Sequence, residues 1–328
     1  MQRRQFIMLL SGAASWPLSV RAQDRARRIG VLAPLPETDP VFQRNINAFT
    51  AAMKSAGWIE GRNLDMRIAS ILGSGKSFLE AAAEVLALSP DAVVAITPVS
   101  AEALHRQTSA VPVIFVVGWF DPVEKGFVTS INQPGGNMTG ITDLEPSLGG
   151  KWLQLLKKIA PNITRAGVVY NPDEGSISEP LFKTFEEAAR SIAIDLERVP
   201  IRDEAEIERV IATFAHHPNG GFFSTSDIFT AAHRTRIIAA ANDHRIPTVF
   251  PYRFYAVDGG LASYSPSQAD EFAQAAYFID HILRGEKPAN LPVQTPNKYE
   301  LVINITTAKA LGIEVPPGLL SIADEVIE

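Results

Sequence analysis

The sequence predicts an α/β protein built from two doubly wound lobes, each around a parallel sheet, joined by a three-strand hinge. Three observations lead to this prediction. Short apolar runs alternate with amphipathic helical patterns from Arg28 onward, this alternation begins again after residues 140–143, and the tail places one long helical pattern between two extended stretches. Short buried strands separated by helices are typical of βαβ units and parallel sheets.

The first series of elements predicts lobe 1. Its apolar runs are candidate strands at residues 28–35, 63–69, 91–97 and 111–117, and the patterns between them are candidate helices at 40–56, 78–88 and 100–108. The 28–35 run opens the series, and each later run follows a helical pattern. A strand that is followed by a crossover helix and another strand forms the parallel unit of a doubly wound sheet.

The segment before the 78–88 helix contains Gly-Ser-Gly-Lys-Ser, which is similar to a phosphate-binding loop. That loop follows the pattern G-x-x-x-x-G-K-[ST], and here Ser70 occupies the position of the first glycine. The alternative is an ordinary helix start, with Ser74 or Ser77 as N-cap and Glu80 in the first turn. We favour the helix start and expect Lys76 to bind no nucleotide.

The second series predicts lobe 2. Candidate strands lie at residues 165–172, 194–201, 220–227 and 246–251, and candidate helices lie at 180–192, 205–215 and 230–242. Because the two series have similar lengths, two lobes of similar construction are expected.

The tail predicts how the lobes are connected. A helix at 268–283 separates extended stretches at 259–267 and 291–304, as expected of a chain that crosses to lobe 1 and returns. The three crossings are expected near residues 140–143, 261–265 and 291–296. On this interpretation lobe 1 comprises residues 28–141 plus 262–293, and lobe 2 comprises residues 142–261 plus 294–328.

The N-terminus predicts a secretory leader over residues 1–22. Arg3 and Arg4 precede an apolar run at 6–20, a Val-Arg-Ala cleavage site follows, and the arginine pair resembles the twin-arginine type. The alternative, a membrane anchor, is disfavoured because the run is short and is interrupted by glycine, serine and proline. We therefore expect a soluble, exported, periplasmic protein.

Composition excludes several classes of function. The chain has 328 residues, 46% of them hydrophobic, and a formal charge of −6 that falls to about −9 without the leader. Such a length and composition supply a sizeable core, and the negative charge disfavours a nucleic-acid partner. The absence of cysteine excludes disulfides, thiol nucleophiles, thiolate metal sites and a lipid anchor on an N-terminal cysteine.

Polar residues that follow the predicted strands are the candidate site, because ligands of doubly wound sheets bind beyond the carboxyl ends of the strands. Thr97 and Ser100 begin a helix, where free N–H groups favour a carboxylate, although simple N-capping by Ser100 is an equal alternative. Asp227 could accept hydrogen bonds from a ligand ammonium or cap the following helix. Trp119 and Tyr252 are candidates to stack on a ring, with packing in the core as the alternative. The expected ligand-binding residues are Thr97, Ser100, Gly118, Trp119, Asp121, Thr142, Asn171, Ser176, Asp227 and Tyr252.

Catalytic motifs are missing from the sequence. It contains neither the G-x-S-x-G nucleophile pattern nor the H-E-x-x-H metal pattern, and its histidines are interpreted as isolated surface residues. No cofactor, metal or catalytic residue is therefore expected.

The longer sequence blocks resemble those of a known family. Besides the leader, they include "AGWIEGRNL", "VPVIFVVGWFDPVEKGFVTSINQPGGNMTGIT", "NPDE", "RIPTVF", "GGLASY" and "HILRGEKPANLPVQTPNKYELVINITTAKALGIEVPPGLL". Together these resemble the ABC transporter substrate-binding proteins related to the tryptophan- and tyrosine-binding lipoproteins. The resemblance implies the type I periplasmic binding protein fold. This chain departs from the many relatives that carry a lipid-anchored cysteine.

The resemblance implies a receptor that closes its lobes on a small molecule and delivers it to an ABC permease. It further implies that the ligand is an amino acid, in many relatives an aromatic one, and we expect the receptor to be a monomer. An exported hydrolase of α/β fold is the alternative from another class of function. A transcriptional regulator with the same core would need a helix-turn-helix before Arg28, where the leader lies.

Overall fold

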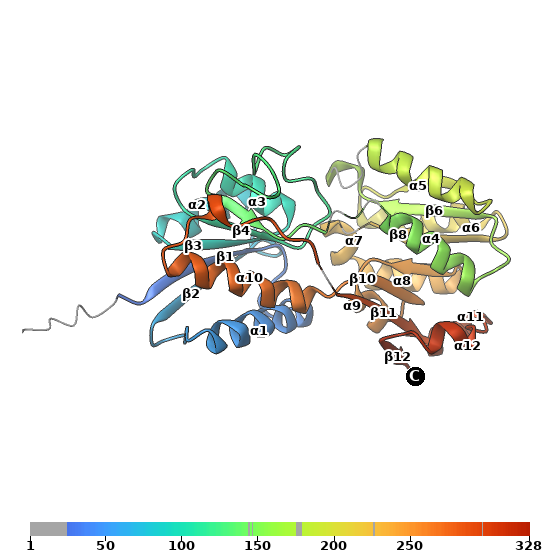
Figure 1. Cartoon of the computed structure of the whole chain (residues 1–328). Helices are drawn as coiled ribbons and strands as arrows, with labels where there is room; N and C mark the ends of the chain where they lie inside the picture. The colour runs from blue at the N-terminus through green and yellow to red at the C-terminus, as the bar shows by residue number, and fades with distance from the viewer. Residues whose placement is uncertain (1–24, 144, 146, 175–178, 226, 297) are drawn as a thin grey trace, which may run out of the picture.

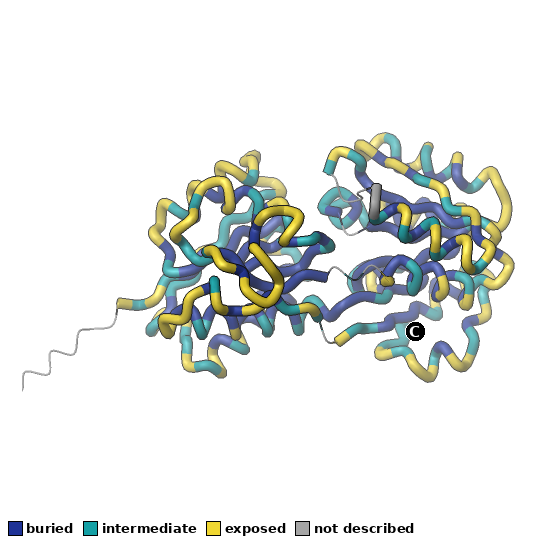
Figure 2. Tube along the Cα trace, turned by 45° about the horizontal axis from the view of Figure 1, so that its top comes forward, coloured by how far each residue is buried: buried dark blue, intermediate teal, exposed yellow. Residues whose placement is uncertain are grey.

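Two lobes lie side by side in the protein, each built around its own β-sheet (Figure 1). The structure is a computed structural model that describes residues 25–143, 145, 147–174, 179–225, 227–296 and 298–328, without the side chains of residues 179 and 180. The tube coloured by burial shows buried segments gathered inside each lobe and exposed residues on its outside (Figure 2). The predicted α/β class with two lobes is confirmed.

Lobe 1 contains a five-stranded parallel sheet in the order β2-β1-β3-β4-β5. Its strands are β1 (Arg27–Ala33), β2 (Leu64–Ser70), β3 (Ala92–Ile96), β4 (Val113–Val116) and β5 (Met138–Gly140). Its helices are α1 (Pro40–Ser55), α2 (Phe78–Ala87) and α3 (Pro98–His105). Strands β3 and β4 are buried throughout, as apolar runs in a doubly covered sheet should be.

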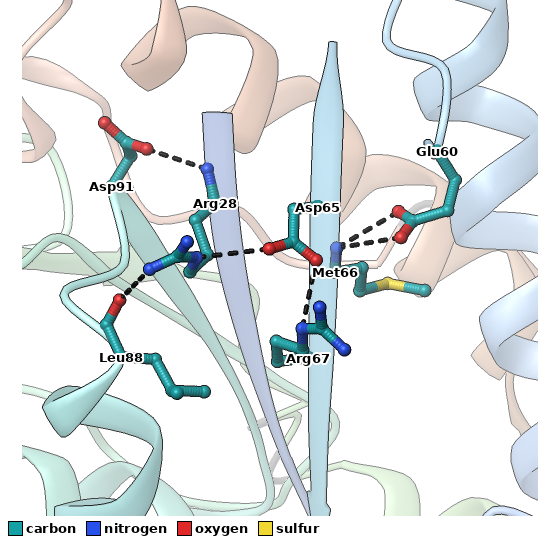
Figure 3. Close-up of polar contacts among 7 residues, drawn as sticks. All are labelled: Arg28, Glu60, Asp65, Met66, Arg67, Leu88 and Asp91. Atoms are coloured by element: carbon teal, nitrogen blue, oxygen red, sulfur yellow. Dashed lines mark hydrogen bonds and ion pairs between the residues drawn. The ribbon is translucent and has the colours of Figure 1, made fainter. Parts of the chain in front are cut away.

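A polar network ties together the amino ends of β1, β2 and β3 (Figure 3). The Arg28 backbone N–H donates to Asp91 at 2.7 Å, and the Arg28 Nε donates to Asp65 at 3.2 Å. Arg67 also pairs with Asp65 at 3.0 Å. Because the candidate site lies at the carboxyl ends of the strands, this network is at the opposite edge of the sheet and stabilises the strand starts.

The start of α2 confirms the structural interpretation of the glycine-rich segment. Ser77 accepts a hydrogen bond from the Glu80 backbone, and the Glu80 side chain accepts one from the Ser77 backbone, which together form a capping box. Lys76 forms an ion pair with the exposed Glu84.

Lobe 2 contains a seven-stranded sheet in the order β12-β11-β10-β9-β8-β6-β7. Its strands are β6 (Arg165–Tyr170), β7 (Asp195–Pro200), β8 (Gly220–Ser224), β9 (Thr248–Phe250), β10 (Ala262–Pro266), β11 (Tyr299–Asn304) and β12 (Glu325–Ile327). All adjacent strand pairs are parallel except β10 with β11. Strand β11 follows the last crossing and enters the sheet in the direction opposite to β10.

The helices of lobe 2 are more divided than predicted. They are α4 (Leu148–Ile159), α5 (Glu179–Ser191), α6 (Ile207–Ala215), α7 (Ile228–Ala232), α8 (Arg234–Asp243), α9 (Arg253–Val257), α11 (Ile305–Leu311) and α12 (Pro317–Leu320), with 3-10 turns η1 (Pro172–Glu174) and η2 (Glu204–Glu206). The helix expected at 230–242 is broken at His233, whose backbone (φ −101, ψ 16) leaves the helical range. Helix α4 was not predicted from the sequence. Near its start lies Gly149, where the Cβ of any other residue would clash with Phe185.

Three connections join the lobes. The chain leaves lobe 1 after β5, returns after β10 into α10 (Gln268–Leu283), and passes the 3-10 turn η3 (Pro288–Asn290) before it crosses back to β11. Helix α10 packs against α1, β3 and β4, so it belongs to lobe 1 although it follows lobe 2 in sequence (Figure 1). Ile141 on the first connection pairs in parallel with Gln294 on the third.

One expected lobe boundary needs correction. Residues 262–266 were expected to begin the return into lobe 1, but they form β10, which pairs with β9 and β11 inside the sheet of lobe 2. The crossing therefore begins after Pro266. The apolar-polar alternation of this segment could not distinguish a connecting strand from a sheet strand, because both are extended.

The predicted leader at residues 1–22 lies outside the described residues. Within the part of the chain that the structure describes, no helix combines the length and apolar character needed to cross a membrane.

Candidate functional site

A cavity of about 430 Å³ lies between the two lobes, and both lobes contribute to its lining. Lobe 1 contributes the segments that follow β1, β3 and β4 and one face of α1. Lobe 2 contributes η1, part of α5 and the starts of α7 and α9. The volume is within the range of about 300 to 1,000 Å³ that is usual for small-molecule sites.

Lobe 1 contributes two strained strand ends. Thr97 follows β3 with a φ of +107°, and Val117 follows β4 with a φ of +57°, values that residues other than glycine rarely adopt. Both residues line the cavity. Backbone strain of this kind is concentrated at functional sites, where the surrounding structure maintains it.

Thr97 and Ser100 have different roles in the structure. Thr97 lines the cavity and caps α3 by accepting a hydrogen bond from the Ser100 backbone at 3.3 Å. Ser100 is fully buried, and its hydroxyl donates to the Ile96 carbonyl at 2.9 Å, so it supports the strand end and does not line the cavity. Pro98 at the first helical position has no N–H, which reduces the number of backbone donors available to an anion.

Trp119 crosses from lobe 1 to lobe 2. Its ring stacks on Phe185 of α5 at 5.4 Å between centroids and lies 5.2 Å from the ring of Trp152 of α4. Its neighbour Phe120 instead packs on Phe115 and Phe127 in lobe 1. Trp119 lines the cavity, and its buried indole N–H finds no acceptor among the described residues.

The acids of lobe 2 gather at the start of α7. Asp227 Oδ1 accepts a hydrogen bond from the Thr230 backbone at 2.6 Å, so the residue is an N-cap. Asp227 Oδ2 accepts hydrogen bonds from the Asn171 backbone at 3.1 Å and the Thr225 hydroxyl at 2.8 Å. Burial raises the pKa of Asp227, and these hydrogen bonds act in the opposite direction.

Glu174 is a second acid of the cavity that the sequence analysis did not select. Its two carboxylate oxygens accept hydrogen bonds from the backbones of Ile228 at 2.7 Å and Phe229 at 3.0 Å. Burial, followed by the charge of Asp227, raises the pKa of Glu174 to about 7. The "NPDE" segment was a sequence signal for this position, but the sequence did not show that the Glu174 side chain accepts hydrogen bonds from the backbone of α7.

A buried pair of carboxyl groups lies at the hinge. Asp143 on the first connection is 4% exposed, and Glu271 in the first turn of α10 is 1% exposed. Asp143 accepts hydrogen bonds from the Gly118 backbone at 3.2 Å and the Tyr252 hydroxyl at 3.4 Å, and its carboxyl group lies beside that of Glu271, with which it shares a hydrogen bond. Burial and then the nearby charge of Asp143 raise the pKa of Glu271 well above its usual range, and burial also raises the pKa of Asp143.

The remaining predicted residues divide between the cavity wall and the layer behind it. The structure places Thr97, Gly118, Trp119, Asp121, Asp227 and Tyr252 on the wall. Thr142 and Asn171 do not line it, since the Thr142 hydroxyl donates to the Phe120 carbonyl at 2.6 Å and the Asn171 amide donates to the Arg202 carbonyl at 3.0 Å. Ser176 lies outside the described residues.

Further residues of the wall were not predicted. Asn45 and Phe42 from α1 and Gln268 from α10 line the cavity, and the Asn45 amide donates to Gln268 at 3.3 Å. Among the described residues, no group of three or more histidine, aspartate or glutamate side chains is arranged to hold a metal ion.

Comparisons with known proteins agree with this architecture. The family model described as ABC transporter substrate binding protein matches residues 28–327. A tyrosine-binding protein of Clostridioides difficile (strain R20291) is 24% identical over 275 residues, which cover 84% of this chain and 78% of the relative.

Two solved structures share the fold. A conserved domain protein from Vibrio cholerae is 27% identical, with a TM-score of 0.83 over 92% of this chain and 100% of the other. An ABC domain from Streptococcus pneumoniae in complex with L-Trp is 24% identical, also with a TM-score of 0.83, over 92% of this chain and 99% of the other.

Proposed function

The chain belongs to the family of ABC transporter substrate-binding proteins, and we propose that its ligand is an amino acid with an aromatic side chain. Proteins of this family bind a substrate for transport and are not enzymes, so the hydrolase alternative is excluded. Substrate-binding proteins act outside the cytoplasm, and we further propose that this one reaches the periplasm through its N-terminal leader and delivers its ligand to an ABC permease.

The observation that carries the proposal is the composition of the interlobe cavity. Aromatic rings of Trp119, Tyr252 and Phe254 share its wall with the carboxylates of Glu174 and Asp227. An aromatic amino acid has a ring that can stack in offset geometry and an ammonium that can pair with an acid. The ligands named for the Streptococcus pneumoniae and Clostridioides difficile proteins support the same class.

Lobe closure would convert binding into a transport signal. Both lobes contribute wall residues, so a ligand in the cavity contacts both and favours the closed arrangement over the open one. A permease that reads the closed form would then receive loaded receptors preferentially.

A thermal-shift screen of the purified protein tests the proposal. We expect L-tryptophan, L-tyrosine or L-phenylalanine to raise the melting temperature, because a ligand at about 100 times its Kd stabilises the native state by about 2.7 kcal/mol. The D-enantiomers and aliphatic L-amino acids are matched controls that should give smaller shifts. If sugars or purines stabilise the protein and aromatic amino acids do not, the ligand assignment is wrong.

A further inference from the structure

We propose that Glu174 is the residue that recognises the ligand ammonium, and that binding of this ammonium releases a proton from the Glu174–Asp227 pair. The inference rests on the proposed function, because it requires a ligand with a protonated amine. It adds a residue role and a proton linkage that the sequence analysis, which assigned the ammonium to Asp227, did not foresee.

Glu174 and Asp227 differ in the hydrogen-bonding capacity that each carboxylate retains. A carboxylate offers about four acceptor positions. Glu174 uses one on each oxygen, for the backbone N–H groups of Ile228 and Phe229. Asp227 already accepts from Thr230, Asn171 and Thr225, and it has a further interaction besides these. Glu174 is therefore the acid with more capacity to accept hydrogen bonds from an ammonium.

The charge around the pair also favours Glu174. No lysine, arginine or histidine forms an ion pair with Glu174 in the part of the chain that the structure describes, and the neighbouring charge acting on it is that of Asp227. Asp173 on the same 3-10 turn is paired with Arg202 and is not part of the cavity wall. Glu174 therefore has backbone N–H groups as partners but no paired cation among the described residues.

The part of the cavity wall that lobe 1 contributes carries more acids than cations. From lobe 1 the cavity is lined by Glu102, Asp121, Glu124 and Lys125, so acids outnumber the single lysine. Tyr252 reaches the wall from lobe 2, and its hydroxyl donates to Asp143. A ligand ammonium would supply a counter-charge for Glu174.

The proton linkage follows from the state of Glu174 in the free protein. With a pKa of about 7, Glu174 is half protonated at neutral pH, and an adjacent ammonium favours the ionised form. Binding at neutral pH should therefore release about half a proton. Because only the ionised fraction binds well, affinity should rise about tenfold between pH 6 and pH 8 and level off above that range.

Isothermal titration calorimetry with L-tryptophan as the probe tests both parts. Titrations at several pH values, in buffers of different ionisation enthalpy, report the affinity and the number of protons released. We expect the wild-type protein to show both pH effects. Glu174→Gln should bind about 10- to 100-fold more weakly at pH 8 and lose the pH dependence, because a hydrogen bond to a charged group contributes about 1.5 to 3 kcal/mol.

Two controls separate this role from a structural one. Asp173→Asn removes a neighbouring exposed acid and should leave affinity and proton release unchanged. Glu174→Gln keeps one side-chain oxygen for the N–H groups of α7 but places an NH2 group opposite the other, so its unliganded melting temperature is measured to separate a loss of stability from a loss of affinity. Its far-UV circular dichroism should match the wild type. Indole-3-propionate, which lacks the ammonium, should bind both proteins weakly and equally.

The outcomes distinguish the inference from the proposed function. If the wild-type protein binds L-tryptophan with no proton release, or Glu174→Gln binds it as tightly as the wild type, the inference is wrong and the receptor function stands. If the wild-type protein binds none of the aromatic amino acids, the proposed ligand class and the role of Glu174 are both rejected.

Discussion

Trp119 should determine how readily the two lobes separate. The next residue in the chain is fixed in lobe 1, since Phe120 packs on Phe115, while the Trp119 ring stacks on Phe185 and packs at a tilt against Trp152, both in lobe 2. When the lobes separate as rigid bodies, the ring must leave that pair. The substitution Trp119→Ala removes this contact from the closed arrangement.

The size of the effect follows from the buried area. A tryptophan side chain buries about 150 to 250 Å², which at about 25 cal/mol per Å² corresponds to about 4 to 6 kcal/mol. Only the part of the ring on Phe185 and Trp152 is exposed by lobe separation, so we take about half, or about 2 to 3 kcal/mol. This energy corresponds to a decrease in ligand affinity of about 30- to 150-fold.

Two measurements check this prediction. Small-angle X-ray scattering of the unliganded protein should show a larger radius of gyration for Trp119→Ala than for the wild type, and calorimetry should show the loss of affinity. Trp119→Phe keeps a ring near Phe185 and should have a smaller effect. Tyr277→Ala truncates an aromatic side chain that is 47% exposed on α10 and should change neither quantity. If Trp119→Ala behaves like Tyr277→Ala, the ring does not hold the lobes together.

Two further predictions concern the hinge and the cleft. Glu271 has a pKa above that of an unfolded-state glutamate, so the stability associated with its neutral form is present below about pH 4.5 and is lost as the pH rises through the folded pKa. Glutamine does not ionise, so Glu271→Gln should not lose this stability as the pH rises. Its melting temperature should therefore exceed that of the wild type by a margin that grows from acidic to alkaline pH. If the two melting temperatures change in parallel with pH, the prediction is wrong. Asp39 caps α1 and pairs across the cleft with Arg234 at 3.7 Å, with both side chains 15% exposed. Asp39→Asn keeps the cap and removes the ion pair, so its ligand affinity should be about 2- to 5-fold lower than that of the wild type at low salt and similar to it at high salt. If the variant and the wild type bind equally well at both salt concentrations, this pair does not contribute to binding.

Local patterns in the sequence were sufficient for the class of the fold and for many element positions. The capping box at Ser77 and Glu80 depends on residues three positions apart, so it could be recognised without the rest of the molecule. The fully buried β3 and β4 were equally clear as apolar runs. Tail segment 262–266 was misassigned because its extended pattern does not specify which sheet it joins.

The sequence predicted which strand ends form the site, but not which side chains line the cavity or contact one another there. The rule that ligands bind beyond the carboxyl ends of parallel strands selected Thr97, Trp119 and Tyr252, and in the structure these residues line the interlobe cavity. It could not distinguish Thr97 on the wall from Ser100 behind it, because both belong to the same helix start. Their separation depends on the direction of each side chain from the turn.

The sequence by itself determined the two lobes, the presence of a hinge, the cap at Ser77 and the loops that form the cavity edge, whereas the cap of α3 is Thr97 and not the predicted Ser100. Each of these features depends on the periodicity of apolar residues or on hydrogen bonds within a few residues of the chain. The tertiary structure alone decided that Trp119 packs in the opposite lobe, that Glu271 is buried beside Asp143, and that Glu174 shares the start of α7 with Asp227. These contacts join residues far apart in sequence, so they form only in the folded chain: Trp119 contacts Phe185 between the lobes, Glu271 meets Asp143 at the hinge, and Glu174 meets the start of α7 within lobe 2.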